Sequence, residues 1–150
     1  MPIYFYSERE QPYGVFSNFS PHGFIVDGRY YPTSEHYFQA QKFVDSPDDY
    51  EAIATARKPK IAADRGRERS RPLRSDWNAV KDDVMRIALR AKFDAHTELR
   101  ELLLSTGTET LIEKTSTDYY WGCGTDGTGK NRLGELLEKL RETYRVEPAV

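Results

Sequence analysis

Apolar residues recur every three or four positions over much of this chain, which is the spacing of helices with one buried face. The longest such stripe runs over 77–95, directly after Asp76, whose carboxylate can cap a helix start. A shorter stripe follows Thr97 and stops at Gly107, and a last one follows Asn131; these two residues are the expected caps of their helices. The pattern therefore predicts three helices in the second half of the chain.

Two further helices are predicted from proline. Pro47 and Pro59 each follow a residue suited to a helix boundary, and proline is tolerated at the first helical position. Ser46 is the expected cap of the first of these helices. They are expected to run over about 47–57 and 59–69.

Residues that favour strands are confined to short runs. The clearest is 24–31, where Asp27-Gly28 separates two such runs and predicts a hairpin with a type I′ turn. Residues 3–6, 110–112 and 119–121 are also expected to be extended. The whole pattern predicts an α+β fold that is rich in helix, with a small antiparallel sheet near the N-terminus.

The stretch 32–43 carries the most unusual pattern of the chain. Pro32 disfavours helix at the residue before it, and Thr33 or Ser34 can cap the helix that follows. One face of this helix would present an acid, an aromatic ring, an amide and an amine, which are Glu35, Phe38, Gln39 and Lys42. Two interpretations stay open: a solvated charged face over packed aromatics, or a chemical site at the positive end of the helix dipole.

Composition limits the classes of protein that this sequence can encode. With 150 residues, 31% charged and 38% hydrophobic, one compact domain over 1–150 is expected, with a frayed tail at 146–150. The formal net charge of -2 argues against a broad, charge-driven nucleic-acid binder. The single Cys123 excludes an internal disulfide, and the histidines lack metal-ligand spacing, so neither a metal nor a cofactor is expected. No run of residues resembles a membrane span or a secretory leader, so a cytoplasmic protein without a membrane partner is expected.

One stretch, 57–74, is strongly basic. Eight of its residues are lysine or arginine, and only Asp64 and Glu68 oppose them. The block is either a solvated pair of helices or a patch that meets phosphates, because guanidinium groups bind phosphate through two parallel hydrogen bonds.

A glycine-rich loop, 122–129, precedes the last helix. With Lys130 it matches the first seven positions of a phosphate-binding P-loop, but Asn131 replaces the hydroxyl residue that would hold Mg²⁺. About twenty residues follow the loop, too few for the parallel sheet of a nucleotide-binding fold. What remains is a loop whose backbone amides can approach a ligand. Asp126 either closes a turn or holds a ribose hydroxyl, and Trp121 is a candidate stacking ring.

Four segments occur together in a recognisable order. They are Phe16-Ser-Asn-Phe19, Tyr31 to Phe43, Asp76-Trp77 with Lys81 and Val84-Met85, and Trp121 to Gly134. The combination covers nearly the whole chain and resembles the NADAR family. The resemblance implies a helix-rich α+β domain and N-glycosidase activity on N-ribosides. One branch of that family hydrolyses phosphorylated riboflavin-pathway intermediates, and another removes ADP-ribose from guanine in DNA or RNA.

The resemblance also implies roles for single residues. The family's catalytic glutamate corresponds to Glu35 and its helix lysine to Lys42. The positions that bind substrate correspond to Asn18, Phe19, Trp77, Trp121, Gly122 and Asp126. From the residues alone, Asn18 could equally cap a turn and Trp77 could equally anchor the core.

The expected chemistry sets a spatial requirement. Cleavage of a ribosyl C–N bond builds positive charge at the anomeric carbon, which ionised Glu35 can stabilise while it activates water. Lys42 can act through its charge or as a Schiff-base amine. The two tryptophans would clamp the base and the glycine loop would take the phosphate, so Glu35 is expected to share one cavity with them. A non-catalytic ADP-ribose reader and a nucleic-acid binder based on 57–74 stay open as alternatives.

Overall fold

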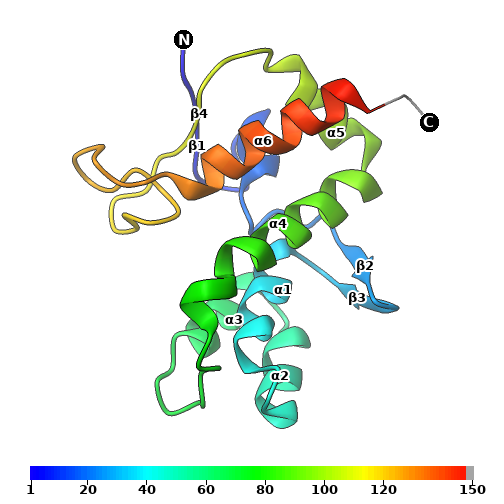
Figure 1. Ribbon diagram of the computed structural model, residues 1–150, viewed down its shortest axis with the longest axis vertical. Helices are drawn as coiled ribbons and strands as arrows, with labels where there is room; N and C mark the ends of the chain where they lie inside the picture. Colours follow the sequence, from blue (N-terminus) through cyan, green and yellow to red (C-terminus); the bar gives the residue numbers. More distant parts are fainter. Residues whose placement is uncertain (148–150) are drawn as a thin grey trace. The chain divides into compact units, whose positions relative to one another are not determined.

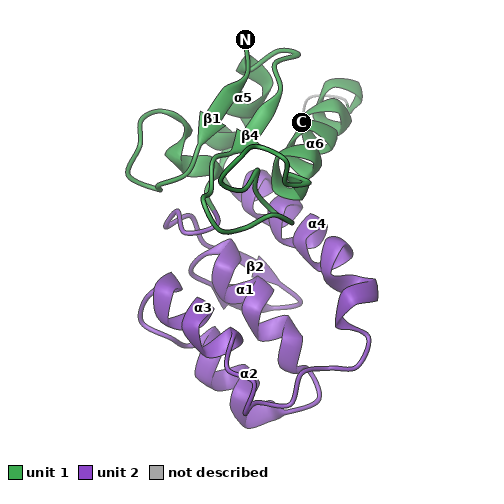
Figure 2. Cartoon of the chain, turned by 90° about the vertical axis from the view of Figure 1, so that its left-hand side faces the viewer, with its two compact units in different colours: residues 1–17, 96–150 green, residues 18–95 purple. Residues whose placement is uncertain are grey.

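A computed structural model describes residues 1–147 of the chain. Its internal contacts divide it into two compact units, residues 18–95 and residues 1–17 with the chain from 96 onward, shown in different colours in Figure 2. The single domain expected over 1–150 stays a prediction. The tail expected at 146–150 begins at the last residue of a helix, and 148–150 lie outside the described residues.

The unit formed by 18–95 begins with a hairpin. Strand β2 (Phe24–Val26) pairs antiparallel with β3 (Arg29–Tyr31), and Phe24 lies opposite Tyr31. Asp27 and Gly28 both have positive φ, 50° and 80°, as a type I′ turn requires. The predicted hairpin and the small antiparallel sheet are therefore confirmed.

Helix α1 (Ser34–Ala40) starts three residues after the hairpin, where the sequence predicts it. Thr33 caps it, because the Thr33 side chain accepts a hydrogen bond from the backbone N–H of His36. The His36 ring reaches the other way and donates from Nε2 to the Ala56 carbonyl at 2.8 Å. A short 3₁₀ turn, η2 (Gln41–Phe43), continues α1, so Lys42 lies on a tighter turn than the α-helical spacing assumed.

Three helices surround α1 in this unit. They are α2 (Pro47–Ala54), α3 (Pro59–Gly66) and α4 (Trp77–Ala95), and all three pack against α1 (Figure 1). Every residue of α1 is buried as a result. The proline-initiated helices begin at the predicted prolines, but each ends three residues early, and α3 ends at Gly66, a weak helix former. Ser46, the expected cap of α2, makes no capping hydrogen bond, and its hydroxyl donates to Asp49 Oδ2.

The other unit is built from both ends of the chain. Strand β1 (Ile3–Phe5) pairs with β4 (Leu111–Glu113), and the pairing is parallel. A 3₁₀ turn, η1 (Tyr13–Phe16), and helices α5 (Thr97–Ser105) and α6 (Arg132–Val146) complete it. The core of this unit contains Phe5, Phe16, Leu103, Leu111, Leu133 and Leu137, all fully buried. The α+β class is confirmed, and none of the helices within residues 1–147 is long and apolar enough to cross a membrane.

Three local predictions were wrong. Residues 119–121 form turns and bends, because Asp118 Oδ1 accepts the backbone N–H groups of Tyr120 and Trp121 at 2.9 and 2.7 Å. Asn131 stands before α6 in a left-handed conformation, and its amide bonds the backbone of β4 and makes no cap. Helix α5 begins at Thr97 itself, with His96 in the capping position.

Candidate active site

The acid and the amine on α1 and η2 are buried. Glu35 is 6% exposed, Gln39 4% and Lys42 7%. The interpretation of this face as a solvated one is therefore wrong, because α2, α3 and α4 cover it. Buried ionisable groups are costly unless they are paired or used, which makes this cluster the first place to look for chemistry.

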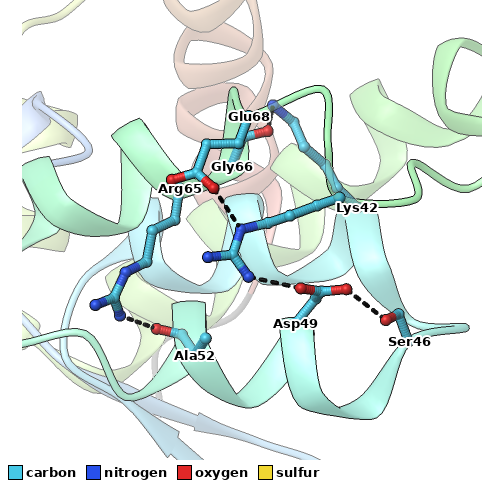
Figure 3. Close-up of polar contacts among 8 residues, drawn as sticks. Lys42, Ser46, Asp49, Ala52, Arg65, Gly66 and Glu68 are labelled. Carbon is cyan, nitrogen blue, oxygen red and sulfur yellow. Dashed lines mark hydrogen bonds and ion pairs between the residues drawn. The ribbon is translucent and has the colours of Figure 1, made fainter.

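One residue of α3, Gly66, contacts both Lys42 and Gln39. The Lys42 ammonium donates to the carbonyl of Gly66 at 3.3 Å, and the close-up in Figure 3 shows these two groups together. The Gln39 amide lies against the same residue, since a Cβ on Gly66 would stand 2.0 Å from Gln39 Oε1. Gln39 Nε2 in turn donates to Glu35 Oε2 at 2.8 Å. Gly66 thus accepts a hydrogen bond from the amine and packs closely against the amide that donates to the carboxylate.

Aromatic rings line the amine. The Lys42 Nζ atom lies 5.9 Å from the ring centroid of Phe38 and 5.8 Å from that of Trp77, within the range of cation–π attraction. The two rings meet edge to face, 5.1 Å apart. Trp77 is 8% exposed, so it packs as a core residue and also borders the candidate site.

The environment of Lys42 favours its neutral form. Burial lowers the pKa of Lys42 to about 8, and the charges of Arg69, Arg67 and Lys81 act in the same direction. Glu35 opposes them, because a nearby carboxylate favours the ammonium. With a pKa of about 8, roughly a tenth of the side chain is an uncharged amine at pH 7.

Asn18 supports the start of α1. Its backbone carbonyl accepts the N–H of Glu35 at 3.1 Å, and its side-chain oxygen accepts the Ser34 hydroxyl at 2.8 Å. The amide nitrogen faces the Met85 sulfur at 3.6 Å. Asn18 therefore fixes the first turn that carries Glu35, while the neighbouring Phe19 is half-buried.

The glycine loop lies in the other unit and is organised by its own hydrogen bonds. Asp126 is exposed, and its Oδ1 accepts from the Thr128 N–H and hydroxyl at 3.1 and 2.7 Å, which holds the pKa of Asp126 below its usual value. Gly122 is close-packed, since a Cβ there would lie 2.3 Å from the Thr115 hydroxyl. Trp121 is half-buried and meets Tyr120 edge to face at 4.8 Å.

The structure thus brings Glu35, Lys42 and Trp77 into one cluster, with Asn18 behind it. The shared cavity with Trp121, Gly122 and Asp126 stays a prediction. Gly66 was not predicted from the sequence as part of the site. The only sequence signal is that a glycine occurs in the basic segment at the end of α3. Among residues 1–147, no three histidine, cysteine, aspartate or glutamate side chains are grouped to hold a metal ion.

Comparison with known proteins places the chain in a family. The NADAR domain model matches residues 4–145. The chain is 55% identical over 146 residues to N-glycosidase YbiA of Escherichia coli, covering 97% of this chain and 89% of that protein. It is 50% identical to N-glycosidase Npun_R5314 of Nostoc punctiforme, covering 97% and 94%.

Two further comparisons concern fold and length. The NMR structure of E. coli YbiA superposes with a TM-score of 0.88 at 53% identity, covering 97% of this chain and 88% of that one. The maize chloroplastic riboflavin biosynthesis protein PYRR is 43% identical over 143 residues, which span 86% of this chain and 23% of that longer protein. Matched along nearly all of its length, the chain belongs to the NADAR family.

Proposed function

We propose that this chain is an N-glycosidase that hydrolyses the C–N bond of an N-riboside, with Glu35 and Lys42 at the reacting centre. The names of two relatives that are at least 50% identical support the activity. The observation that carries the assignment of residues is the buried cluster itself. Its amine, of lowered pKa, donates to the Gly66 carbonyl, and its carboxylate accepts from Gln39, whose amide packs against Gly66.

Glu35 supplies the negative charge and the base. As the C–N bond breaks, its electron pair leaves with the base nitrogen and C1 of the ribose becomes cation-like, which a carboxylate stabilises. Water adds to C1 and gives its proton to Glu35, which passes it to the departing nitrogen. The Gln39 amide, bonded to Glu35 Oε2, holds the carboxylate in one orientation.

Lys42 has two possible roles, and the lowered pKa is compatible with both. As an ammonium it would stabilise developing negative charge on the ring oxygen or a hydroxyl. As a neutral amine it would attack C1 and expel the base, which takes up the proton that the amine loses. The bond between C1 and the ring oxygen then breaks, a proton passes to that oxygen, and the resulting iminium is hydrolysed by water to the free sugar and the amine. The second route requires the uncharged fraction that burial provides.

We assign substrate recognition to the residues that correspond to substrate-binding positions of the NADAR family. Trp77 and Trp121 are proposed to stack on the base, and Asn18, Phe19, Gly122 and Asp126 to contribute to the substrate site. A small riboside phosphate of the riboflavin-pathway type is favoured as substrate, since the name of the maize relative points to that pathway. ADP-ribosyl-guanine in DNA or RNA is the second candidate, and the cytoplasm is the proposed location.

The decisive variant is Glu35→Gln, which preserves shape and the hydrogen bond from Gln39. Product formation from the best N-riboside should fall by about 10² or more, as expected for loss of a general base. The exposed Glu101→Gln on α5 is the matched control and should keep wild-type turnover. Unchanged turnover in Glu35→Gln would remove this residue from the chemistry.

The substrate class needs a separate comparison. The protein is incubated with phosphorylated riboflavin-pathway intermediates and, separately, with ADP-ribosyl-guanine DNA, and free base and sugar are measured. Release of base from the first alone identifies a small-molecule enzyme. Binding of ADP-ribose without release of base from any N-riboside would support the non-catalytic reader and contradict the proposal.

A further inference from the structure

The basic block 57–74 separates into two groups by what its side chains contact. Four cations of the block are bound within the chain. Three of them form ion pairs and one bonds a carbonyl: Lys60 with Asp64, Arg71 with Asp49 and Glu68, Arg74 with Asp76, and Arg65 with the Ala52 carbonyl. Figure 3 shows the Arg65, Glu68 and Asp49 ends of this network. Arg65 and Arg71 bind residues of α2, and the other two bind neighbours in the sequence. A broad nucleic-acid surface over the whole block is therefore not supported.

Arg67 and Arg69 belong to the second group. Both are exposed, and neither guanidinium has a hydrogen bond or ion pair among residues 1–147. They follow directly on Gly66, whose carbonyl accepts the Lys42 ammonium. Their charges are therefore attached to the same end of α3 that anchors the candidate catalytic amine.

Lys81 approaches the amine from a second helix. It follows Trp77 by four residues on α4, so the two side chains lie on one face of that helix. The Trp77 ring is 5.8 Å from Lys42 Nζ. The charges of Arg67, Arg69 and Lys81 all act on Lys42, and Glu35 is the opposing charge. The acid-and-amine cluster is thus bordered by more positive than negative charge.

Such a surplus of positive charge beside a buried ammonium destabilises the free protein and favours an anion. We propose that Arg67 and Arg69, assisted by Lys81, bind the phosphate group of the substrate and thereby select phosphorylated ribosides over unphosphorylated ones. This rests on the proposed N-glycosidase function. Guanidinium groups suit the task because each can grip two phosphate oxygens at once.

The proposal predicts a linked electrostatic effect. A bound phosphate dianion offsets the charges of Arg67, Arg69 and Lys81, so the pKa of Lys42 rises when the phosphate is in place. Replacement of Arg67 and Arg69 by neutral residues raises the pKa of Lys42 in the free enzyme for the same reason.

The test compares two double variants that remove the same charge from the same block. Arg67→Gln with Arg69→Gln removes the proposed phosphate site, and Arg57→Gln with Lys58→Gln removes two exposed cations at the opposite end of α3. The KM and kcat of each are measured on a riboside 5′-phosphate and on its dephosphorylated counterpart. The first variant should raise KM for the phosphate by about 10-fold or more, as expected for lost charged hydrogen bonds, and leave the other substrate within about 2-fold. The control should change neither.

A binding measurement keeps the test independent of turnover. Titration calorimetry with ribose 5-phosphate, ADP-ribose and inorganic phosphate should show affinities about 10-fold weaker in the Arg67/Arg69 variant and unchanged in the control. A loss for ADP-ribose alone assigns the site to a diphosphate, and a loss for the monoester assigns it to a terminal phosphate. Equal affinities in all three proteins, or equal KM changes on both substrates, would overturn the proposal and point to the glycine loop for the phosphate. Absence of turnover with normal phosphate binding would instead count against the proposed function alone.

Discussion

The α1 cluster and the glycine loop are the two candidate regions of this chain, and they differ in how their polar groups are held. Glu35, Gln39 and Lys42 are buried and are fixed by other elements of their unit. Residues 125–128 of the loop are exposed, and Asp126 bonds a residue two positions away. Burial lowers the pKa of Lys42, which increases the fraction of reactive neutral amine, whereas hydrogen bonds from Thr128 lower the pKa of Asp126 and favour its ionised form. The comparison teaches that the buried α1 cluster is suited to catalysis, whereas the hydrogen bonds of the glycine loop serve to fix the conformation of the loop.

The largest predicted difference is in the chemical step. Lys42→Ala should lower kcat by about 10² or more, because it removes a group at the reacting centre. Asp126→Ala should lower kcat/KM by about 10-fold at most, since it removes a turn closure or a ribose contact. Steady-state kinetics on one N-riboside check both. A larger loss for Asp126 than for Lys42 would reverse the assignment of the two regions.

The pH dependence of kcat/KM distinguishes the roles of Lys42, because it reports the pKa values of the free enzyme. The charged groups that act on Lys42 are Glu35, Arg67, Arg69 and Lys81, and its pKa is about 8. A neutral nucleophile makes kcat/KM rise as pH increases through about 8, and a required ammonium makes it fall. Reduction with borohydride during turnover should label Lys42 only in the first case. A profile that is flat between pH 7 and 9 would exclude Lys42 from the rate-limiting chemistry.

Glycine substitutions give an intermediate effect. Gly66→Ala places a Cβ 2.0 Å from Gln39 Oε1, so the amide must move and Glu35 loses its orientation. We expect kcat to fall by about 10-fold and the free energy of unfolding by about 1–3 kcal/mol. Gly127→Ala is the counterpart in the loop, where φ is 80° and no atom lies within 4 Å, so only backbone strain of about 1 kcal/mol is expected. Equal effects on kcat would show that Gln39 does not position Glu35.

The smallest effect on activity is expected at the second buried lysine of the same unit. Lys92 is 0% exposed, and burial lowers its pKa to about 7. The unfolded chain therefore binds an extra proton between pH 7 and about 10, and stability should rise with pH by up to about 1.4 kcal/mol per unit. Lys92→Met should flatten this rise and leave kcat unchanged. Urea unfolding at pH 7, 8 and 9 measures it, and parallel curves for the two proteins would contradict the prediction.

Local sequence predicted the elements better than it predicted their surroundings. Asp27-Gly28 determines the hairpin and Pro59 determines a helix start, because each acts through its own backbone. The burial of Lys42 has no local trace, since a polar residue seven positions after Glu35 resembles a solvated helix face. Burial follows from three helices packing around a seven-residue helix, which only the tertiary structure supplies.

Contacts between residues far apart in the chain could also not be predicted from the sequence. The parallel ladder of β1 and β4 joins residues 108 positions apart, such as Ile3 and Leu111. Nothing near either strand specifies the partner or the direction, because both are short and bounded by turns. The resemblance of motifs pointed to Glu35 and Lys42, but the hydrogen bond from Lys42 to the Gly66 carbonyl could be found only in the structure.

The position of Gly66 has a practical consequence for protein engineering. A library aimed at new substrates should keep this glycine and diversify the two arginines that follow it. Those guanidinium groups are exposed, so exchanging them carries little risk to folding. Under the proposal that they bind phosphate, the exchange changes which substrates the enzyme accepts. Because Gly66 carries a hydrogen where other residues carry a Cβ, substitution there is expected to disturb the candidate site, whereas the exposed Arg67 and Arg69 are expected to tolerate many replacements.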